Sequence, residues 1–301
     1  MTINEGGPQG RSPDRREGVL KSNFVEMLEA RWAKGNFVCV GLDTELGKIP
    51  DTVIKRGKFV PDIIASFNID IIEATNEYAC AFKPNTAFYE AHGADGFRAL
   101  RQTVRYIKRA YPDIPVILDA KRGDIGNTNN GYAQMAFEQM DADAITVHPY
   151  LGAEALKPFL DKRDKGILVL TKTSNPGAGE FQDVELGNGM RMYAYVASQV
   201  AYGDWNRNGN CGLVVGATYP AELEKVRSIV GDMPILIPGI GAQGGDLEAS
   251  VRAGQDSRGW GMIINSSRGI IFASSGEDFA QAAGEEARRL HDSINQIRQA
   301  A

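Results

Sequence analysis

Eight short apolar runs, separated by longer amphipathic segments, recur along most of this chain. Apolar runs without polar alternation are typical of strands that are buried on both faces, as in parallel sheets. The runs lie at residues 37–42, 80–82, 116–118, 144–147, 167–170, 213–215, 235–237 and 262–264. The segments that we expect to be helices lie at 61–78, 96–111, 130–140, 153–160, 190–205, 221–230, 246–253 and 277–299. Eight strand–helix alternations predict an α/β protein with a single (β/α)8 TIM barrel.

Length and the N-terminal residues complete the predicted domain organisation. A barrel of this class needs ~250 residues, and the chain has 301. Residues 1–18 are polar and rich in helix breakers, so we expect a flexible tail, disordered or extended, ahead of a barrel domain at 19–301. An N-terminal helix precedes the first strand, with an apolar face made by Phe24, Met27, Leu28 and Trp32. The alternative is a doubly wound open sheet, but no G-x-G-x-x-G motif follows the first run.

The charge balance and the cysteines exclude several classes of partner and site. With 33 basic and 38 acidic residues and no long basic run, the chain has no electrostatic basis for binding nucleic acid or an anionic membrane. No apolar run reaches ~18 residues and the N-terminus has no apolar core, so we expect neither a membrane span nor a secretory signal. Cys39, Cys80 and Cys211 form no C-x-x-C pair and lie in apolar surroundings, which predicts buried thiols in a reducing cytoplasm.

Polar residues gather where the apolar runs end. In a barrel of this kind the active site lies at the C-terminal ends of the strands. The side chains that follow the runs are those of Asp43, Lys83, Asp119, Lys121, Asp124, His148, Thr171, Thr173, Ser174, Thr218 and residues 265–268. We therefore expect the catalytic site at this end of the barrel.

The segment after the third run reads Asp119-x-Lys121-x-x-Asp124. Residues i and i+2 of a strand point to the same side, so Asp119 and Lys121 should project together into the mouth of the barrel, where Lys83 joins them. A structural ion-pair network is the alternative interpretation, but desolvating several charges is costly and rarely stabilising. Dense mixed charge at this face therefore indicates a catalytic function.

A glycine-rich loop at 238–246 follows the seventh run, and Ser266-Ser267-Arg268-Gly269 follows the eighth. Glycines let backbone N–H groups approach a phosphate closely, and an arginine can bind two phosphate oxygens at once. Loops after strands seven and eight form the usual phosphate site of such barrels. An ordinary turn is the alternative for the glycine loop alone, but together with Arg268 it predicts a site for a small phosphorylated ligand.

Six stretches of the sequence match one known family in order. They are GLDTE at 41–45, FKPNTAFYEAHG at 82–93, DAKRGDIGNT at 119–128, TSNPG at 173–177, PGIGAQGGD at 238–246 and NSSRGI at 265–270. Through them the chain resembles the orotidine 5′-phosphate decarboxylase family, specifically its longer bacterial-type branch. The resemblance implies decarboxylation of orotidine 5′-monophosphate (OMP) to UMP without a cofactor. This reaction is the last step of de novo pyrimidine synthesis, and the resemblance implies that a homodimer performs it.

The resemblance also implies a role for each matching residue. Lys121 would donate a proton to C6 of the pyrimidine and stabilise the carbanion that forms as carbon dioxide leaves. Asp119 would lie against the substrate carboxylate and hold Lys121. Lys83 would bridge the ribose hydroxyls and the other charged groups, and Asp43 would bind the ribose.

Further residues would bind the rest of the nucleotide or act across the dimer interface. The resemblance implies that three residues enter the partner subunit's site, namely Asp124, Ile125 and Thr128. The remaining substrate-binding positions that we expect are Thr173, Ser174, Pro238, Gln243, Ser267 and Arg268. Of these, Gln243 and Arg268 would bind the phosphate, and either Thr173 or Ser174 would contact the pyrimidine edge. The segment Lys172–Gly189 and the loop around Gln243 are candidate lids, although the longer segment could equally be a passive surface insertion.

Three other functions fit parts of the pattern. A metal-dependent keto-sugar-phosphate decarboxylase on the same scaffold shares D-x-K-x-x-D, but such relatives carry a glutamate at the second strand end to help hold magnesium, where this chain has Lys83. A Schiff-base aldolase needs a neutral lysine, and the flanking carboxylates keep the lysine charged. A non-catalytic barrel that binds a phosphate ligand would not require the intact Asp119, Lys121 and Asp124 set.

Overall fold

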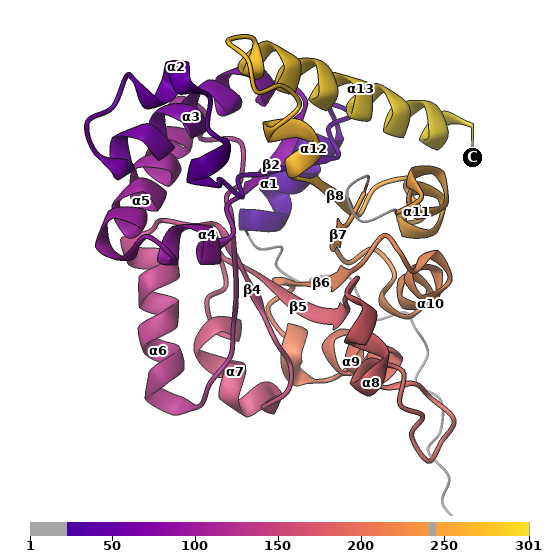
Figure 1. Ribbon diagram of the computed structural model, residues 1–301. Coiled ribbons are helices and arrows are strands. Elements are labelled where there is room, and N and C mark those ends of the chain that lie inside the picture. Colours follow the sequence, from indigo (N-terminus) through magenta and orange to yellow (C-terminus); the bar gives the residue numbers. More distant parts are fainter. Residues whose placement is uncertain (1–22, 241–244, 301) are drawn as a thin grey trace, which may run out of the picture.

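Eight parallel strands form one barrel in the computed structural model, which describes residues 23–240 and 245–300 (Figure 1). The strands are β1 Val38–Gly41, β2 Ala79–Lys83, β3 Ile117–Arg122, β4 Ala144–Val147, β5 Gly166–Lys172, β6 Cys211–Val215, β7 Ile235–Pro238 and β8 Met262–Ser266. Their order is β2-β1-β8-β7-β6-β5-β4-β3. Isolated bridges pair Phe82 with Val116 and Asn85 with Asp119, and so join β2 to β3. The predicted TIM barrel is confirmed, and the doubly wound sheet is excluded.

Helices surround this barrel (Figure 1). They are α1 Asn23–Trp32, α2 Asp51–Ile54, α3 Val60–Thr75, α4 Thr86–Glu90, α5 Gly93–Ala110, α6 Gly126–Gln134, α7 Gly152–Leu160, α8 Gly179–Gln182, α9 Met192–Tyr202, α10 Pro220–Val230, α11 Leu247–Gly254, α12 Arg268–Ile271 and α13 Phe279–Gln299. The long helices agree with the amphipathic segments. The short helices α2, α4, α8 and α12 were not predicted, because a single turn has no apolar period to detect.

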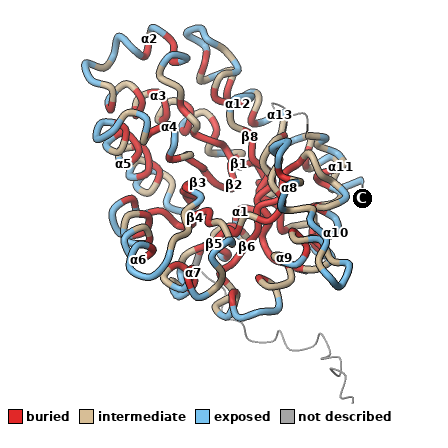
Figure 2. The backbone as a smooth tube through the Cα atoms, turned by 60° about the horizontal axis from the view of Figure 1, so that its bottom comes forward, coloured by how far each residue is buried: buried red, intermediate tan, exposed pale blue. Residues whose placement is uncertain are grey.

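The strands form the centre of the core. Every residue of β1, β2, β4, β6 and β8 is buried, which is why their sequences show no polar alternation. Figure 2 shows burial concentrated on the strands and on the inward faces of the helices. Strand residues become accessible to solvent only toward the C-terminal ends of the strands. In β3, for example, the first residues are buried and Lys121 is exposed.

Helix α1 lies across the opposite, N-terminal end of the barrel. Phe24 and Trp32 are buried there, and the Arg31 Nε donates a 2.8 Å hydrogen bond to the carbonyl of Ala79, at the start of β2. A Cβ atom on Gly166, the first residue of β5, would lie 2.2 Å from the Phe24 ring, so this position requires glycine. The N-terminal face of the barrel is therefore closed by packing, and access to the interior is left to the C-terminal face.

Some predictions concern residues whose structure is not described. The proposed tail at 1–18 lies outside the described residues, as does Gln243 in the glycine-rich loop. Among the helices that are described, none combines the length and the apolar character that a bilayer crossing requires.

Candidate active site

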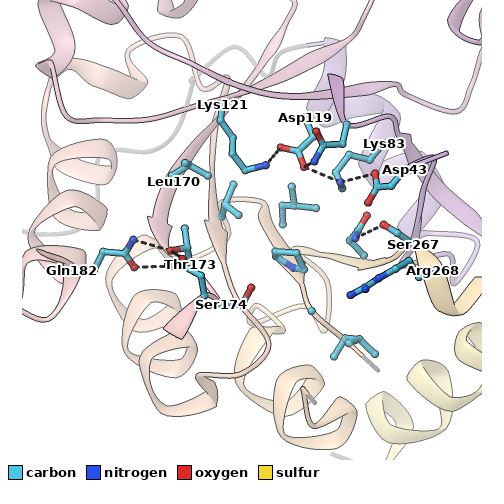
Figure 3. A pocket seen from close by; sticks show the side chains of 18 residues that line it. Asp43, Lys83, Asp119, Lys121, Leu170, Thr173, Ser174, Gln182, Ser267 and Arg268 are labelled. Atoms are coloured by element: carbon cyan, nitrogen blue, oxygen red, sulfur yellow. Dashed lines mark hydrogen bonds and ion pairs between the residues drawn. The ribbon is translucent and has the colours of Figure 1, made fainter. Parts of the chain in front are cut away.

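A cavity of about 530 Å³ opens at the C-terminal ends of the strands (Figure 3). Its apolar floor includes Leu170, Val214 and Leu236, from three consecutive strands. Polar side chains from β1, β2, β3, β5 and β8 surround this floor, and the backbone of residues 238–240 adds a further wall. The cavity therefore lies where the barrel architecture predicts a catalytic site.

Four charged side chains on one wall of the cavity form a charge network, which consists of Asp43, Lys83, Asp119 and Lys121. Asp119 is central: its Oδ2 lies 3.0 Å from Lys83 Nζ, and its Oδ1 lies 2.6 Å from Lys121 Nζ. Lys83 Nζ also lies 4.0 Å from Asp43 Oδ1. The side chain of Lys83 is 3% exposed and that of Lys121 is 48% exposed, so the first is enclosed by the barrel and the second faces the opening.

The charges of this network shift the pKa values of its members. Burial opposes ionisation of Asp119, but the attraction of Lys83 and Lys121 outweighs burial and holds the pKa of Asp119 well below its usual range. Burial also opposes the charged form of Lys83, yet the neighbouring Asp119 and Asp43 raise the pKa of Lys83 above its usual range. Asp119 and Lys83 are consequently an ionised pair at neutral pH.

The backbone at Lys121 departs from regular strand geometry. Its φ angle is 45°, in the left-handed region that non-glycine residues rarely adopt. The register of β3 against β4 shifts between Leu118 and Arg122, and the Lys121 N–H donates a 2.9 Å hydrogen bond to Thr146 Oγ1 instead of extending the ladder. The same hydroxyl donates to Asp119 Oδ1 at 2.9 Å. Asp119 and Lys121 do meet in the mouth of the barrel, but a local kink places them there, not the plain strand alternation that we expected.

A buried polar cluster supports Asp43 from behind. The Tyr89 hydroxyl donates to the carbonyl of Leu42 at 2.9 Å, and Asn68 Nδ2 donates to the Tyr89 oxygen at 3.0 Å. Thr44 Oγ1 donates to Asn68 Oδ1 at 2.5 Å. These contacts hold the residues on both sides of Asp43, so side chains from α3 and α4 fix the backbone from which its carboxylate projects.

The end of β8 supplies the wall next to Asp43, because β8 pairs with β1 in the barrel. Ser267 and Arg268 line the cavity, and Arg268 begins the short helix α12 (Figure 3). A Cβ atom on Gly41 would lie 1.8 Å from Ser267 Oγ, so glycine lets β1 pass close beside this wall. A short extra helix after the eighth strand is the usual location of a phosphate site in such barrels. This wall therefore has the donors and the position that a phosphate group requires.

The remaining predicted residues fall into three groups. Thr173, Ser174 and Pro238 line the cavity. Gln243 lies outside the described residues. The third group lies beyond β3, at the start of α6, and is not part of the cavity lining in this chain: Asp124, Ile125 and Thr128.

Several polar residues that line the cavity had no role assigned to them from the sequence. Asn85 lies 3.5 Å from Asp119 Oδ2 through its Nδ2 atom, and Asn265, expected at this end of the barrel but without a role, presents a buried side chain at the end of β8. Both belong to stretches that carried the family resemblance, so that resemblance was a usable signal for them. Gln182 lies in α8, outside every matched stretch, and the sequence placed it only within the candidate lid segment Lys172–Gly189, without a role of its own.

The described residues form no cluster of the side chains that usually hold a metal ion. Within 23–240 and 245–300, no three His, Cys, Asp or Glu side chains come together as a ligand group. His148, which follows β4, instead hydrogen-bonds through its Nε2 atom to the carbonyl of Gly123 at 2.8 Å.

Comparisons with known proteins agree with this geometry. The profile of the orotidine 5′-phosphate decarboxylase / HUMPS family matches residues 36–283. The orotidine 5′-phosphate decarboxylase of Bordetella pertussis is 49% identical over 277 residues, which are 91% of this chain and 99% of that protein. The enzyme of the same name from Ralstonia nicotianae is 50% identical over 276 residues, again 91% of this chain and 99% of the relative.

Solved structures show the same likeness in three dimensions. The OMP decarboxylase of Leishmania donovani superposes with a TM-score of 0.78 at 41% identity, covering 92% of this chain and 99% of that one. Fold, sequence and family profile thus agree over nearly the whole barrel. This chain belongs to the orotidine 5′-phosphate decarboxylase / HUMPS family.

Proposed function

We propose that this enzyme decarboxylates OMP to UMP and carbon dioxide, the last step of UMP synthesis, with no metal or organic cofactor. The observation that carries the proposal is the charge network, in which Asp119 lies between two ammonium groups at the cavity wall. Relatives with close to half of their residues identical are named for this activity. The proposal therefore joins a family assignment to a charge arrangement that suits the reaction.

The chemistry requires a cation beside the carbon that loses carbon dioxide. When the bond between C6 and the carboxylate breaks, the electron pair stays on C6 as a carbanion without an adjacent electron sink. The ammonium of Lys121 stabilises that charge and then transfers a proton to C6, which completes UMP. Asp119 orients Lys121 through their 2.6 Å contact and lies where it meets the substrate carboxylate. Each 1.4 kcal/mol gained only in the transition state raises the rate about tenfold.

The other lining residues suit the remaining parts of the nucleotide. Asp43 Oδ1 and Asn265 Oδ1 are buried and accept no hydrogen bond from the described residues. Buried acceptors of this kind call for a donor, and the ribose hydroxyls supply one. Arg268 and Ser267, with the expected help of Gln243 and Pro238, bind the phosphate. Thr173 and Ser174 face the pyrimidine.

We also propose that the active enzyme is a homodimer, in which Asp124, Ile125 and Thr128 complete the partner subunit's site. Exposed apolar side chains around Asp124 support this: Ile125 is 62% exposed and Tyr150 is 84% exposed. The loops that carry them are neighbours, because the His148 N–H donates to the carbonyl of Arg122 at 3.0 Å. Apolar groups gathered beside a polar site are typical of a protein interface.

The proposed domain boundaries and location follow the sequence. Residues 19–301 form the catalytic barrel and residues 1–18 a tail. Cys39, Cys80 and Cys211 are free and buried, which supports a reducing, cytoplasmic location for the enzyme.

The competing function is a metal-dependent decarboxylation of a keto-sugar phosphate on the same scaffold. Lys83 argues against it, because this 3% exposed ammonium occupies the second strand end and would repel a metal ion. Incubation of the purified chain with OMP and, separately, with a keto-sugar phosphate, each with and without EDTA, decides between the two. We expect UMP to form from OMP at the same rate with and without EDTA, whereas decarboxylation of the keto-sugar phosphate alone, dependent on added Mg²⁺, would favour the rival.

Removal of Lys121 tests the mechanism directly. We expect Lys121→Ala to lower kcat/KM for OMP by more than about 10⁴-fold, because one residue supplies both the stabilising charge and the proton. Folding should be unaffected, since the side chain is 48% exposed and Asp119 keeps its contact with Lys83. Lys162→Ala, at an exposed ion pair with Glu138, is the control and should retain full activity. UMP formation at an undiminished rate by Lys121→Ala would refute the mechanism.

A further inference from the structure

Two pairs of side chains tie the short helix α8 back to the end of β5. The amide of Gln182 bridges Thr173: its Oε1 accepts from the Thr173 N–H at 2.8 Å, and its Nε2 donates to Thr173 Oγ1 at 2.8 Å (Figure 3). Beside this pair, Lys172 Nζ lies 2.7 Å from both carboxylate oxygens of Asp183. Two adjacent residues at the end of β5, Lys172 and Thr173, thus contact two adjacent residues at the end of α8, Asp183 and Gln182 respectively.

The Lys172–Asp183 pair is an anchor that resists separation. The Lys172 side chain is 0% exposed, and its ammonium also lies 4.4 Å from the centre of the Tyr219 ring. Separation of the pair would leave a buried charge without its partner, which is strongly unfavourable. Gln182, one residue before Asp183, is consequently held against Thr173 by a contact that does not depend on Gln182 itself.

The bridge from Gln182 determines how Thr173 can meet a ligand. A backbone N–H can only donate, so the orientation of the Gln182 amide is fixed, and Thr173 Oγ1 must accept from Nε2. The hydroxyl of Thr173 also donates to Asn175 Oδ1 at 2.7 Å. The Thr173 N–H is already engaged, so a ligand reaches Thr173 through its hydroxyl oxygen, whose position both amide side chains define.

We propose that Gln182 is a positioning residue for pyrimidine recognition, acting through Thr173. It holds the Thr173 hydroxyl against the base edge, and the Lys172–Asp183 pair holds Gln182. This inference rests on the proposed function, because it takes the ligand in the cavity to be a pyrimidine nucleotide. It also gives a role to part of the segment Lys172–Gly189. The part of this segment nearest to β5 is held in place by these contacts and forms a fixed wall of the cavity.

The test compares ligands with and without the base. We expect Gln182→Ala to raise KM for OMP and the inhibition constant of UMP about tenfold, the effect of one lost hydrogen bond. The inhibition constant of ribose 5-phosphate, which lacks the base, should not change. The kcat value should stay within about threefold, because the contact is made equally in the ground state and the transition state. Glu180→Ala, an exposed change in the same helix, should match the unmodified protein in every assay.

A double variant shows whether Gln182 acts through Thr173. If it does, adding Gln182→Ala to Thr173→Val should cause little further loss. The inference is overturned if UMP and ribose 5-phosphate weaken equally, if neither weakens, or if the full effect of Gln182→Ala persists beside Thr173→Val. An unmodified protein that forms no UMP from OMP would instead refute the proposed function, so the two failures are distinguishable.

Discussion

Lys121, the proposed proton donor, has an unusual backbone conformation. A left-handed φ of 45° on a lysine costs of the order of 1 kcal/mol or more. The hydrogen bonds of Thr146, which accepts from the Lys121 N–H and donates to Asp119, hold this conformation in place. Strain retained beside the reacting group, with contacts that fix it, is typical of a residue placed for function.

Asp119 should give the protein a pH-dependent stability of defined sign. Its pKa is held below the usual value in the folded state, so the ionised carboxylate stabilises the fold above about pH 4 and this contribution is lost as the pH falls further. We expect the difference in free energy of unfolding between the protein and Asp119→Asn to be constant from about pH 5 to 8. Below about pH 4 the difference should narrow, by at most about 1.4 kcal/mol per pH unit.

Urea unfolding at a series of pH values measures this difference directly. The unmodified protein should be the more stable one near neutrality, because the neutral amide introduced by Asp119→Asn cannot compensate the buried ammonium of Lys83. A difference that widened toward acid pH would show that Asp119 is protonated in the folded protein, contrary to the proposed charge arrangement.

The role of a single residue was predictable where its chemical partner lies a few positions away in the sequence. Asp119 and Lys121 lie two positions apart at the end of one strand, so their meeting in the barrel mouth could be predicted, although the kink that brings them together could not. Gln182 could not be inferred, because its role depends on how the chain returns to β5 and nothing in its local sequence marks that return. The kink at Lys121 was also missed, since a register shift against β4 is a property of two strands and not of one sequence segment.

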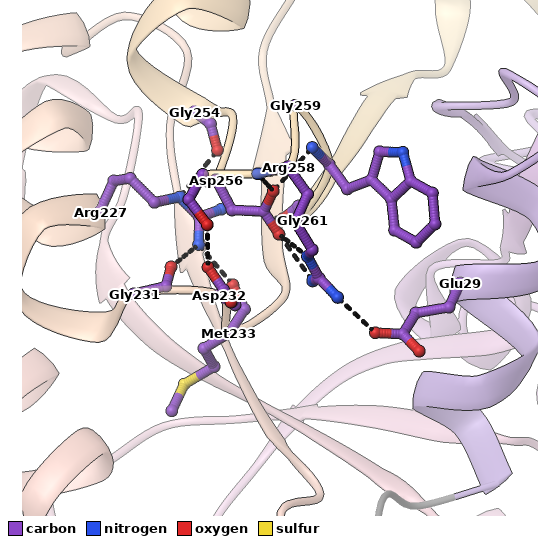
Figure 4. A network of polar contacts seen from close by, with 12 residues as sticks. Glu29, Arg227, Gly231, Asp232, Met233, Gly254, Asp256, Arg258, Gly259 and Gly261 are labelled. Atoms are coloured by element: carbon purple, nitrogen blue, oxygen red, sulfur yellow. Dashed lines mark hydrogen bonds and ion pairs between the residues drawn. The ribbon is translucent and has the colours of Figure 1, made fainter. Parts of the chain in front are cut away.

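At the scale of elements, an arginine in α10 joins the N-terminal ends of β7 and β8 (Figure 4). The Arg227 guanidinium donates to the carbonyls of Gly254, Met233 and Gly261 at 2.9, 2.7 and 2.9 Å, and to that of Gly231. Burial lowers the pKa of Arg227 to about 10, against the attraction of Asp256. One side chain thus satisfies carbonyl groups from several loops at this end of the barrel.

Replacement of Arg227 should reduce stability without affecting catalysis. We expect Arg227→Met to lower the free energy of unfolding by about 3 kcal/mol, because several buried carbonyls lose their donor together. The value of kcat/KM for OMP should not change, since the residue lies at the end of the barrel opposite the cavity. Arg207→Met, which breaks an exposed pair with Asp204, is the matched control and should leave the free energy of unfolding almost unchanged. Equal losses in the two variants would contradict this account.

Whether an element was predictable depended on the burial pattern in its sequence and not on its length, since strands of four residues were located and the five-residue helix α4 was not. The apolar runs located all eight strands, because burial on both faces leaves a continuous signal in the sequence. The one-turn helices α4, α8 and α12 were not located, yet each lies beside the cavity. They are positioned by contacts with the strand ends, such as the Asn85 side chain that accepts from the Ala87 N–H at the start of α4.

At the scale of the whole molecule, one subunit contains most of the proposed site but not all of it. Asp43, Lys83, Asp119 and Lys121 share one cavity, whereas Asp124 lies beyond β3, next to exposed Ile125 and near exposed Tyr150. A homodimer with two-fold symmetry would bury these apolar groups and bring each Asp124 toward the other subunit's cavity. If the site is shared between subunits in this way, two different inactive subunits can restore activity to each other, which subunits with self-contained sites cannot do.

Mixed dimers of two inactive variants should recover activity. A hybrid of Lys121→Ala and Asp124→Ala subunits contains one site that has both residues and one that has neither. Random pairing of equal amounts makes half of the dimers hybrids, so about a quarter of all sites should be complete and kcat per site should recover to about that fraction. The pair Lys121→Ala and Asp119→Asn is the control: both residues belong to the same cavity, so every hybrid site carries one lesion and no activity should return. Equal recovery in both mixtures, or none in the first, would show that Asp124 does not act across the interface.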